Sequence, residues 1–204
     1  GETIEDAVER AQEKEKKGYV YSYDMLGEGA RTARDADRYY ESYVKAIKVI
    51  GKAAGGKGPR KSPGISVKLS AIHPRYEFVQ YERVMAELPA RLKALCLMAK
   101  EYNIGLTVDA EEADRLETSL DIIETVFRDP DLAGWDGFGL AVQAYQKRAL
   151  HVIEWLRELT QDVGRKMMVR LVKGAYWDTE IKLTQMAGLD AFPVFTRKSS
   201  TDVS

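Results

Sequence analysis

The sequence has few of the features that mark secreted, membrane-spanning or nucleic-acid-binding proteins. Its single cysteine, Cys96, excludes a disulfide framework and favours a reducing, cytoplasmic compartment. No apolar run approaches the ~18 residues that a bilayer span requires, and no segment has the pattern of a secretory signal peptide. The 31 Lys and Arg residues nearly balance the 32 Asp and Glu residues, and a formal net charge of −1 argues against a dedicated nucleic-acid binder.

The residues that are present have the composition of a folded globular domain. Hydrophobic residues make up 45% of the 204 residues and charged residues 31%, unlike the composition of a disordered chain. Cys96 lies in the apolar helical segment 92–98, so we expect it to be a buried packing residue. The two histidines, His73 and His151, have too few neighbouring ligands to indicate a metal site.

Hydrophobic periodicity predicts alternating strands and helices after a first helix. That helix is capped by Thr3 and ends at Gly18, so residues 1–18 lead into one domain formed by residues 19–204. Segments of period two predict six strands, at residues 19–26, 65–70, 104–110, 138–144, 167–172 and 193–196. Segments of period 3.6 between them predict helices. One ends near residue 50, one contains residues 88–98, and three cover residues 116–127, 149–159 and 177–186. Repeated strand–helix units indicate parallel strands joined by right-handed crossovers.

Two parallel architectures fit this order, a closed eight-fold barrel and an open doubly wound sheet. The open sheet usually carries a G-x-G-x-x-G fingerprint at its first strand–helix turn, and Gly27-Glu28-Gly29 lacks the third glycine. The segment 51–58 approaches a phosphate-loop pattern, but Gly58 replaces the hydroxyl residue and the segment follows a helix, so we interpret it as a basic surface loop. The barrel is therefore favoured.

The predicted strands carry polar residues on one face near their carboxyl ends. Branched residues alternate with Ser66 and Lys68 in one strand, and Asp109, Gln143 and Arg170 take the corresponding face in the next three. In a barrel the branched face packs on the helices, so these polar side chains converge inside, where barrels keep their active sites. An ion network that only fills the barrel is the structural alternative, but isolated buried charges are costly and barrel interiors are usually apolar.

Six segments, in order along nearly the whole chain, resemble the proline dehydrogenase family, and above all the dehydrogenase domain of bacterial bifunctional proline-utilisation flavoproteins. They are YSYDMLGE at 21–28, GISVKLS at 64–70, VDAEE at 108–112, QAYQKR at 143–148, RLVKGAYW at 170–177 and FTRK at 195–198. The resemblance implies a distorted (β/α)8 barrel of TIM type, preceded by a helix, that binds FAD and oxidises L-proline to Δ1-pyrroline-5-carboxylate. It also implies transfer of the electrons to a membrane quinone, an aldehyde dehydrogenase domain in the same polypeptide, and peripheral contact with the inner membrane.

The resemblance also implies roles for individual residues. Catalytic roles fall to Lys68, Asp109, Arg170 and Tyr176, and the proline site is bordered by Lys68, Asp109, Ala175 and Tyr176. The flavin site is implied at Asp109, Gln143, Arg170, Val172, Gly174, Ala175, Tyr176, Trp177, Thr196, Arg197, Lys198 and Thr201. Trp177 could instead cap the barrel. Glu28 matches a glutamate that forms an ion-pair gate with an arginine of the family's last helix.

Elementary chemistry is consistent with these implied roles. A fixed guanidinium such as Arg170 can stabilise negative charge that develops on a flavin ring, and Gln143 offers a donor and an acceptor to its edge. Gly174 allows the backbone a close approach to a cofactor. The triplet 196–198 supplies hydroxyl and cationic groups suited to a pyrophosphate, although a solvated basic loop is the plain alternative.

The family pattern is not complete in these residues. The sequence stops at Ser204, before the seventh and eighth strands and the helix with the family's substrate-binding arginines, so we expect a C-terminally truncated barrel of about six strands that is itself inactive. Two other functions stay open. One is a metal-dependent barrel lyase or aldolase that uses Asp109, Glu111 and Glu112 as oxygen ligands. The other is a non-catalytic barrel fragment.

Overall fold

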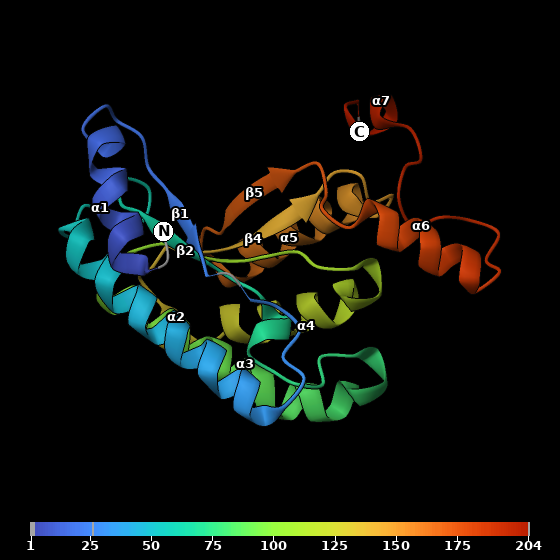
Figure 1. The fold of residues 1–204 in the computed structure, drawn as a ribbon, viewed down its shortest axis with the longest axis horizontal. Coiled ribbons are helices and arrows are strands. Elements are labelled where there is room, and N and C mark those ends of the chain that lie inside the picture. Colours follow the sequence, from blue (N-terminus) through green and yellow to red (C-terminus); the bar gives the residue numbers. More distant parts are fainter. Residues whose placement is uncertain (1–2, 26, 204) are drawn as a thin grey trace.

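The computed structural model, which describes residues 3–25 and 27–203, is an α/β fold built on one parallel sheet (Figure 1). Five strands are hydrogen-bonded in chain order: β1 (Ser22–Asp24), β2 (Gly64–Val67), β3 (Leu106–Val108), β4 (Phe138–Gln143) and β5 (Met168–Val172). The helices are α1 (Ile4–Glu15), α2 (Ala33–Ala54), α3 (Tyr81–Glu101), α4 (Leu116–Phe127), α5 (Ala149–Val163), α6 (Trp177–Met186) and α7 (Lys198–Thr201). Short 3₁₀ turns lie at Leu69–Ala71, Phe78–Gln80, Ala113–Arg115 and Pro130–Leu132.

The helix boundaries follow from local sequence signals. Thr3 caps α1 by accepting a hydrogen bond from the Asp6 N–H group, as the sequence predicts. Thr32 and Asp35 form a capping box at the start of α2, where each side chain accepts a hydrogen bond from the backbone N–H of the other residue. Gly55 ends α2 in the left-handed conformation. Because α2 continues to Ala54, it includes the first half of the glycine-rich segment 51–58, which we interpreted as a surface loop.

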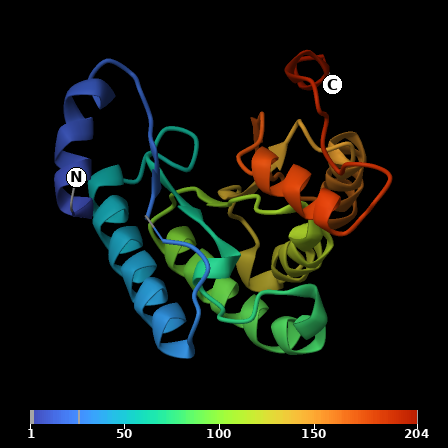
Figure 2. The same cartoon turned by 45° about the vertical axis from the view of Figure 1, so that its right-hand side comes forward.

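Helices α2, α3 and α4 lie side by side against one face of the sheet (Figures 1 and 2). Their inner faces and the branched face of the strands form one core, which includes Ile47, Leu92 and Ile65. Cys96 is fully buried in this core, as predicted, and burial raises the pKa of its thiol. None of the helices in the described ranges has both the length and the apolar character that a bilayer crossing requires.

The sheet curls strongly toward a barrel but does not close. In a flat sheet β2 and β5 would be separated by three spacings of about 4.8 Å. Instead, Arg170 on β5 donates from Nη1 to Ser66 Oγ on β2 at 2.8 Å and also contacts Ser22 on β1. β1 and β5 are the two edge strands among the described residues, and the TIM-type α/β fold class that we predicted is confirmed.

The predicted sixth strand at 193–196 is wrong. Val194 forms one isolated antiparallel bridge with Gln146, and the Phe195 N–H donates to the Tyr145 carbonyl at 2.7 Å. This segment is therefore held by the turn that follows β4 and does not extend the sheet beside β5. Three other strands are shorter than predicted by two or more residues. The one at 19–26 is confined to β1, with Leu26 outside the described residues, the one at 65–70 ends at Val67, and the one at 104–110 covers only Leu106–Val108.

The close contact between α2 and α3 predicts an unusual response at Gly51. Replacing a glycine inside a helix with alanine normally stabilises the helix by up to ~1 kcal/mol. A Cβ atom at Gly51, however, would overlap the Tyr102 ring. We expect Gly51→Ala to lower the free energy of unfolding by about 1–3 kcal/mol, because overpacking outweighs helix propensity. Chemical denaturation measures this, with exposed Lys48→Ala on the same helix as the control; a more stable Gly51→Ala variant would contradict the packing described.

Candidate active site

Three of the predicted site residues meet at the carboxyl ends of the strands. Asp109, directly after β3, accepts hydrogen bonds from Lys68, directly after β2, and from Arg170 on β5. The Lys68 Nζ atom lies 3.1 Å from Asp109 Oδ2 and 2.7 Å from Asp24 Oδ2. Two cations and two carboxylates thus form one cluster, which we call the ion cluster. Strand alternation predicted that Lys68, Asp109, Gln143 and Arg170 would converge. The three charged residues are in direct contact, and Gln143 lines the same pocket.

Lys68 is held in this cluster as a cation. Burial alone lowers the pKa of its ammonium group, but the hydrogen bonds to Asp24 and Asp109 outweigh burial and raise the pKa above its ordinary value. The Lys68 backbone N–H also donates to the Tyr43 hydroxyl on α2 at 3.2 Å. Both the charge and the position of Lys68 are therefore fixed by the surrounding chain.

Gln143 joins the loops that surround the ion cluster. Its side-chain Nε2 donates to the Glu111 carbonyl at 2.9 Å, and its Oε1 accepts from the Ala175 N–H at 3.0 Å. The adjacent Gly174 has φ of +141°, and a Cβ atom there would lie 2.5 Å from the Tyr145 ring. A residue with a side chain could not take this position, which brings bare backbone to the edge of the site.

The same hydrogen bonds continue around the strand ends. The Gly29 N–H donates to Ser70 Oγ at 3.1 Å, and the Ser70 N–H donates to the buried Glu111 carboxylate at 3.0 Å. With the two bonds of Gln143, these contacts link the segments after β1, β2, β3 and β5 to the end of β4. We call this chain of Gly29, Ser70, Glu111, Gln143 and Ala175 the hydrogen-bond belt.

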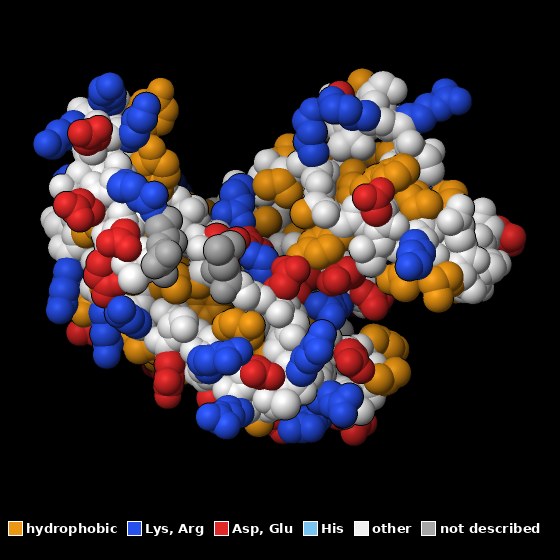
Figure 3. Space-filling view, in the orientation of Figure 1, with side chains coloured by type: hydrophobic (Ala, Val, Ile, Leu, Met, Phe, Trp, Pro, Cys, Tyr) orange, Lys and Arg blue, Asp and Glu red, His pale blue; other side chains and the backbone are white. Residues whose placement is uncertain are grey.

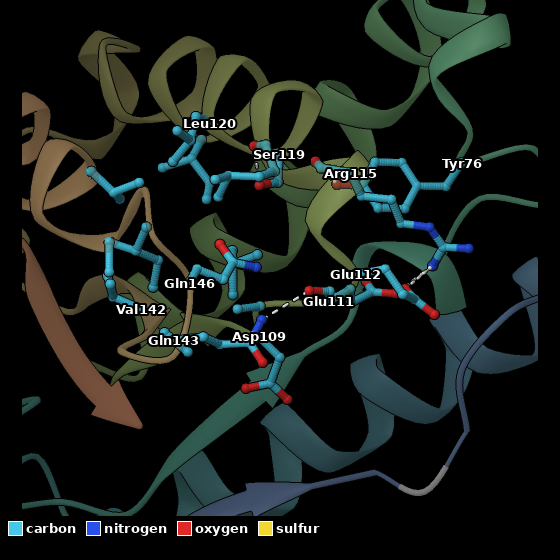
Figure 4. A pocket seen from close by; sticks show the side chains of 18 residues that line it. Tyr76, Asp109, Glu111, Glu112, Arg115, Ser119, Leu120, Val142, Gln143 and Gln146 are labelled. Carbon is cyan, nitrogen blue, oxygen red and sulfur yellow. Dashed lines mark hydrogen bonds and ion pairs between the residues drawn. The ribbon is translucent and has the colours of Figure 1, made fainter. Parts of the chain in front are cut away.

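The placement of the acidic residues after β3 excludes one of the open alternatives, the metal-dependent lyase or aldolase that uses Asp109, Glu111 and Glu112. A metal site at Asp109, Glu111 and Glu112 requires the three carboxylates to face one another, but β3 ends at Val108. Figure 4 shows Glu111 and Glu112 directed toward Arg115, at 2.8 and 3.1 Å, while Asp109 points away from them. No group of three or more His, Cys, Asp or Glu side chains in residues 3–25 and 27–203 is placed to hold a metal ion.

Two adjoining pockets open beside the ion cluster, on the side where Figure 3 shows a hollow between α1 and the α6–α7 region. Each has a volume of about 330–340 Å³, within the range of ligand sites, and they share Lys173 and Gly174. The first pocket is lined by the ion cluster and by Ala110, Ala141, Gln143, Val172, Ala175 and Tyr176. The second is lined by Tyr145, Trp177, Phe195, Thr196, Lys198 and Thr201. Among the described residues, the predicted site residue Arg197 lines neither pocket.

Tyr176 and Glu28 meet at the rim of the first pocket. The Tyr176 hydroxyl donates to Glu28 Oε2 at 3.2 Å. Burial and the Glu28 carboxylate raise the pKa of the Tyr176 phenol well above its ordinary value, so the phenol keeps its proton. Trp177 borders the second pocket, and its indole Nε1 donates to the Phe195 carbonyl at 3.0 Å.

An acidic residue that sequence reasoning did not single out binds two lysines that line the second pocket. Asp202 accepts hydrogen bonds from Lys173 at 2.5 Å and from Lys198 at 2.9 Å, and these two ammonium groups lower the pKa of Asp202 to about 2. Asp24, Glu180 and Tyr145 were also missed. Asp24 could have been found from the sequence. It follows Tyr23 at the end of its strand as Lys68 follows Val67, so it is expected on the same polar face as Lys68.

A curled parallel sheet with a charged site at its carboxyl edge defines a barrel-type α/β enzyme domain. The sequence profile described as "Proline dehydrogenase" matches residues 7–204. The chain therefore belongs to the proline dehydrogenase family, which confirms the resemblance found in the sequence.

Individual proteins agree with this assignment. The chain is 58% identical to "Bifunctional protein PutA" of Klebsiella aerogenes over all of its 204 residues, which are 16% of that protein. It is 29% identical to "Proline dehydrogenase 1" of Bacillus subtilis (strain 168) over 86% of the chain and 50% of that protein. A crystal structure of a mutant Bradyrhizobium japonicum Proline Utilization A superposes with a TM-score of 0.90 at 60% identity, over 100% of this chain and 20% of that one. The chain thus spans a small part of the bifunctional relatives.

Proposed function

We propose that this chain forms the proline- and flavin-binding part of an FAD-dependent dehydrogenase that oxidises L-proline to Δ1-pyrroline-5-carboxylate, the first step of proline catabolism. The observation that carries the proposal is the ion cluster, which lines a pocket of ligand size in a member of the proline dehydrogenase family. Electron transfer to a membrane quinone, peripheral contact of a cytoplasmic protein with the membrane, and a fused aldehyde dehydrogenase domain belong to the same proposal.

The residues around the two pockets suit a flavin dinucleotide. The pockets adjoin along Lys173 and Gly174, so one elongated ligand can occupy both. The first pocket offers the Arg170 guanidinium beside small apolar residues, which suits a ring system that gains electrons. The second offers ammonium and hydroxyl groups, which suit phosphates. Residues that would hold the cofactor are Arg170, Val172, Lys173, Gly174, Ala175, Thr196, Lys198 and Thr201.

Four residues of the first pocket have a definite chemical part in the proposed reaction. When bound, a flavin would supply the acceptor for the hydride that leaves the methylene carbon bonded to the proline nitrogen, while the proton on that nitrogen is released to solvent. Lys68 offers a cation to the substrate carboxylate, and Asp109 orients both Lys68 and Arg170. Arg170 places a fixed positive charge where negative charge develops. Tyr176 keeps its proton, so its hydroxyl serves as a hydrogen-bond donor at the rim and not as a base.

The direct test uses a full-length protein that contains this chain. It is purified, its visible absorption spectrum is recorded, and L-proline is added without oxygen. The proposal expects a yellow protein with one flavin per chain, whose absorption is bleached by L-proline and not by D-proline. A colourless protein that does not take up added FAD, or a flavin that proline does not reduce, would show that the chain has another function.

Lys68→Met should weaken the binding of proline. The substitution removes the ammonium group that contacts Asp24 and Asp109 and leaves a side chain of similar length. We expect the dissociation constant for proline, measured by anaerobic titration of the flavin absorption, to rise about tenfold, which corresponds to about 1.4 kcal/mol. Exposed Lys61→Met is the matched control. An unchanged titration in the Lys68→Met protein would remove Lys68 from substrate binding.

A further inference from the structure

Glu180 is a buried acid that the proposed reaction does not use. It lies in the first turns of α6, and 4% of its surface is exposed. Glu111 is the other acidic residue found in the buried class among the described residues, and Arg115 neutralises it at 2.8 Å. For Glu180, the described residues provide no ion pair. Its Oε1 atom accepts one hydrogen bond, from the Ala113 backbone N–H at 2.7 Å.

The surroundings make this carboxylate costly. Burial raises the pKa of Glu180, and the hydrogen bond from Ala113 lowers it. The nearby carboxylates of Asp114 and Glu112 raise the pKa further, the Arg148 guanidinium lowers it, and the net result is a raised pKa. An apolar side chain would fill the same volume without the cost of burying a charge. It would, however, leave the Ala113 N–H without a partner in the protein interior. The hydrogen bond to the Ala113 N–H is therefore the one advantage that a glutamate has over an apolar residue at position 180.

This contact joins two segments that border the proposed site. Ala113 lies in the loop after β3, four residues beyond Asp109, and the Ala113 carbonyl accepts from Arg148 at 2.7 Å. Glu180 lies on the helix whose N-terminal residues, Tyr176 and Trp177, line the two pockets. The Glu180 N–H donates to the Tyr176 carbonyl at 3.0 Å, so the first turn of α6 is rigidly connected to both residues.

We propose that Glu180 is a positioning residue: its carboxylate anchors α6 to the β3–α4 loop and thereby fixes Tyr176 and Trp177 against the substrate and cofactor pockets. This inference rests on the proposed function, because it takes these pockets as the sites of proline and FAD. Glu180 itself lines neither pocket among the described residues, so it acts only through α6.

Two substitutions remove the same hydrogen bond from opposite sides. Glu180→Ala removes the acceptor. Ala113→Pro removes the donor, and the backbone there suits proline, because Ala113 is the first residue of a 3₁₀ turn and the preceding Glu112 is extended at φ −61° and ψ 155°. Glu180→Gln keeps an acceptor oxygen at nearly the same place. Asp178→Asn, an exposed acid in the same helical turn, is the matched control for the change in charge.

The experiment measures hydrogen–deuterium exchange and ligand binding in the full-length protein. In Glu180→Ala we expect amide exchange in segments 109–115 and 176–187 to accelerate at least tenfold, since a hydrogen bond to a charged group is lost. The dissociation constants for FAD, from flavin fluorescence with the apoprotein, and for proline should each rise about tenfold. Glu180→Gln and Asp178→Asn should stay within threefold of the parent. The double variant Glu180→Ala, Ala113→Pro should be no worse than the more affected single variant, because both remove one interaction.

Each result bears on a separate claim. Unchanged exchange in Glu180→Ala, or fully additive effects in the double variant, would overturn the anchor. Faster exchange with unchanged binding of FAD and proline would overturn the positioning role. If Glu180→Ala does not fold, Glu180→Gln and Ala113→Pro still provide the comparison, since Gln must preserve binding and Pro must weaken it. A parent protein that binds neither FAD nor proline would refute the proposed function, while the exchange data would still test the anchor.

Discussion

Asp109→Ala is expected to reduce proline oxidation by about 100-fold or more while leaving the thermal stability nearly unchanged. Within residues 3–25 and 27–203, Asp109 is the one carboxylate that contacts both Lys68 and Arg170. Without it the two cations lose the partner that holds them together, and their mutual repulsion shifts them from their positions at the first pocket. The fold keeps its core because Asp109 lies after the last residue of β3, and because Lys68 retains Asp24 and Arg170 retains Ser66. Steady-state kinetics and thermal unfolding of the same preparations measure the two effects.

Exposed Asp136→Ala is the control for loss of one acidic residue, and both its activity and its unfolding temperature should match the parent. Asp109→Asn separates charge from shape, because the amide keeps an acceptor for one cation but carries no charge. If Asp109→Ala loses thermal stability in proportion to its activity, the ion cluster is a structural network and its assignment to substrate chemistry fails.

Arg170→Met is expected to cause the second large loss, in flavin reduction rather than in proline affinity. Its guanidinium is fixed by Asp109 and by Ser66 at 2.8 Å, so it cannot turn away from the pocket when charge develops. Removing one preorganised hydrogen-bond donor to developing negative charge typically costs about 100- to 1,000-fold in rate. We expect the single-turnover rate of flavin reduction by proline to fall by about that factor, with weaker retention of FAD.

Arg170→Lys tests whether a charge alone is enough, since lysine lacks the planar fork that contacts two partners at once. Arg157→Met, on the exposed face of α5, is the control. At matched flavin content, equal reduction rates in Arg170→Met and the parent would exclude Arg170 from the mechanism. In the double variant Arg170→Met, Asp109→Ala, the losses in the rate of flavin reduction should be less than additive, because the two residues share one contact.

The ion cluster could be predicted because its residues obey the simplest rule of strand geometry. Side chains alternate between the two faces of a strand, and the carboxyl ends of parallel strands meet at one edge. Lys68, Asp109 and Arg170 needed no further information. The resemblance to a family then supplied Gly174 and Tyr176, whose place at the pockets depends on the irregular segment after β5.

Other features could not be predicted because they depend on where strands end and on contacts between distant loops. The residues 65–70 alternate as a strand does, yet the chain turns at Lys68 into a 3₁₀ turn, since the Ser70 N–H finds Glu111 instead of a strand partner. The segment 193–196 has the apolar character of a strand but pairs with the turn after β4. Periodicity within one segment cannot show either partner.

The hydrogen-bond belt has a consequence for how substitutions in this chain will be tolerated. Ser70 and Ala175 are 105 positions apart in the chain, yet two residues, Glu111 and Gln143, connect them. A change at any member therefore disturbs loops whose own sequences are intact. Positions that never touch a ligand will behave genetically like active-site positions, and a harmful change at one of them will be compensated by changes in a neighbouring loop. We therefore expect these five positions to change together in evolution, because selection acts on the hydrogen-bond belt as a whole.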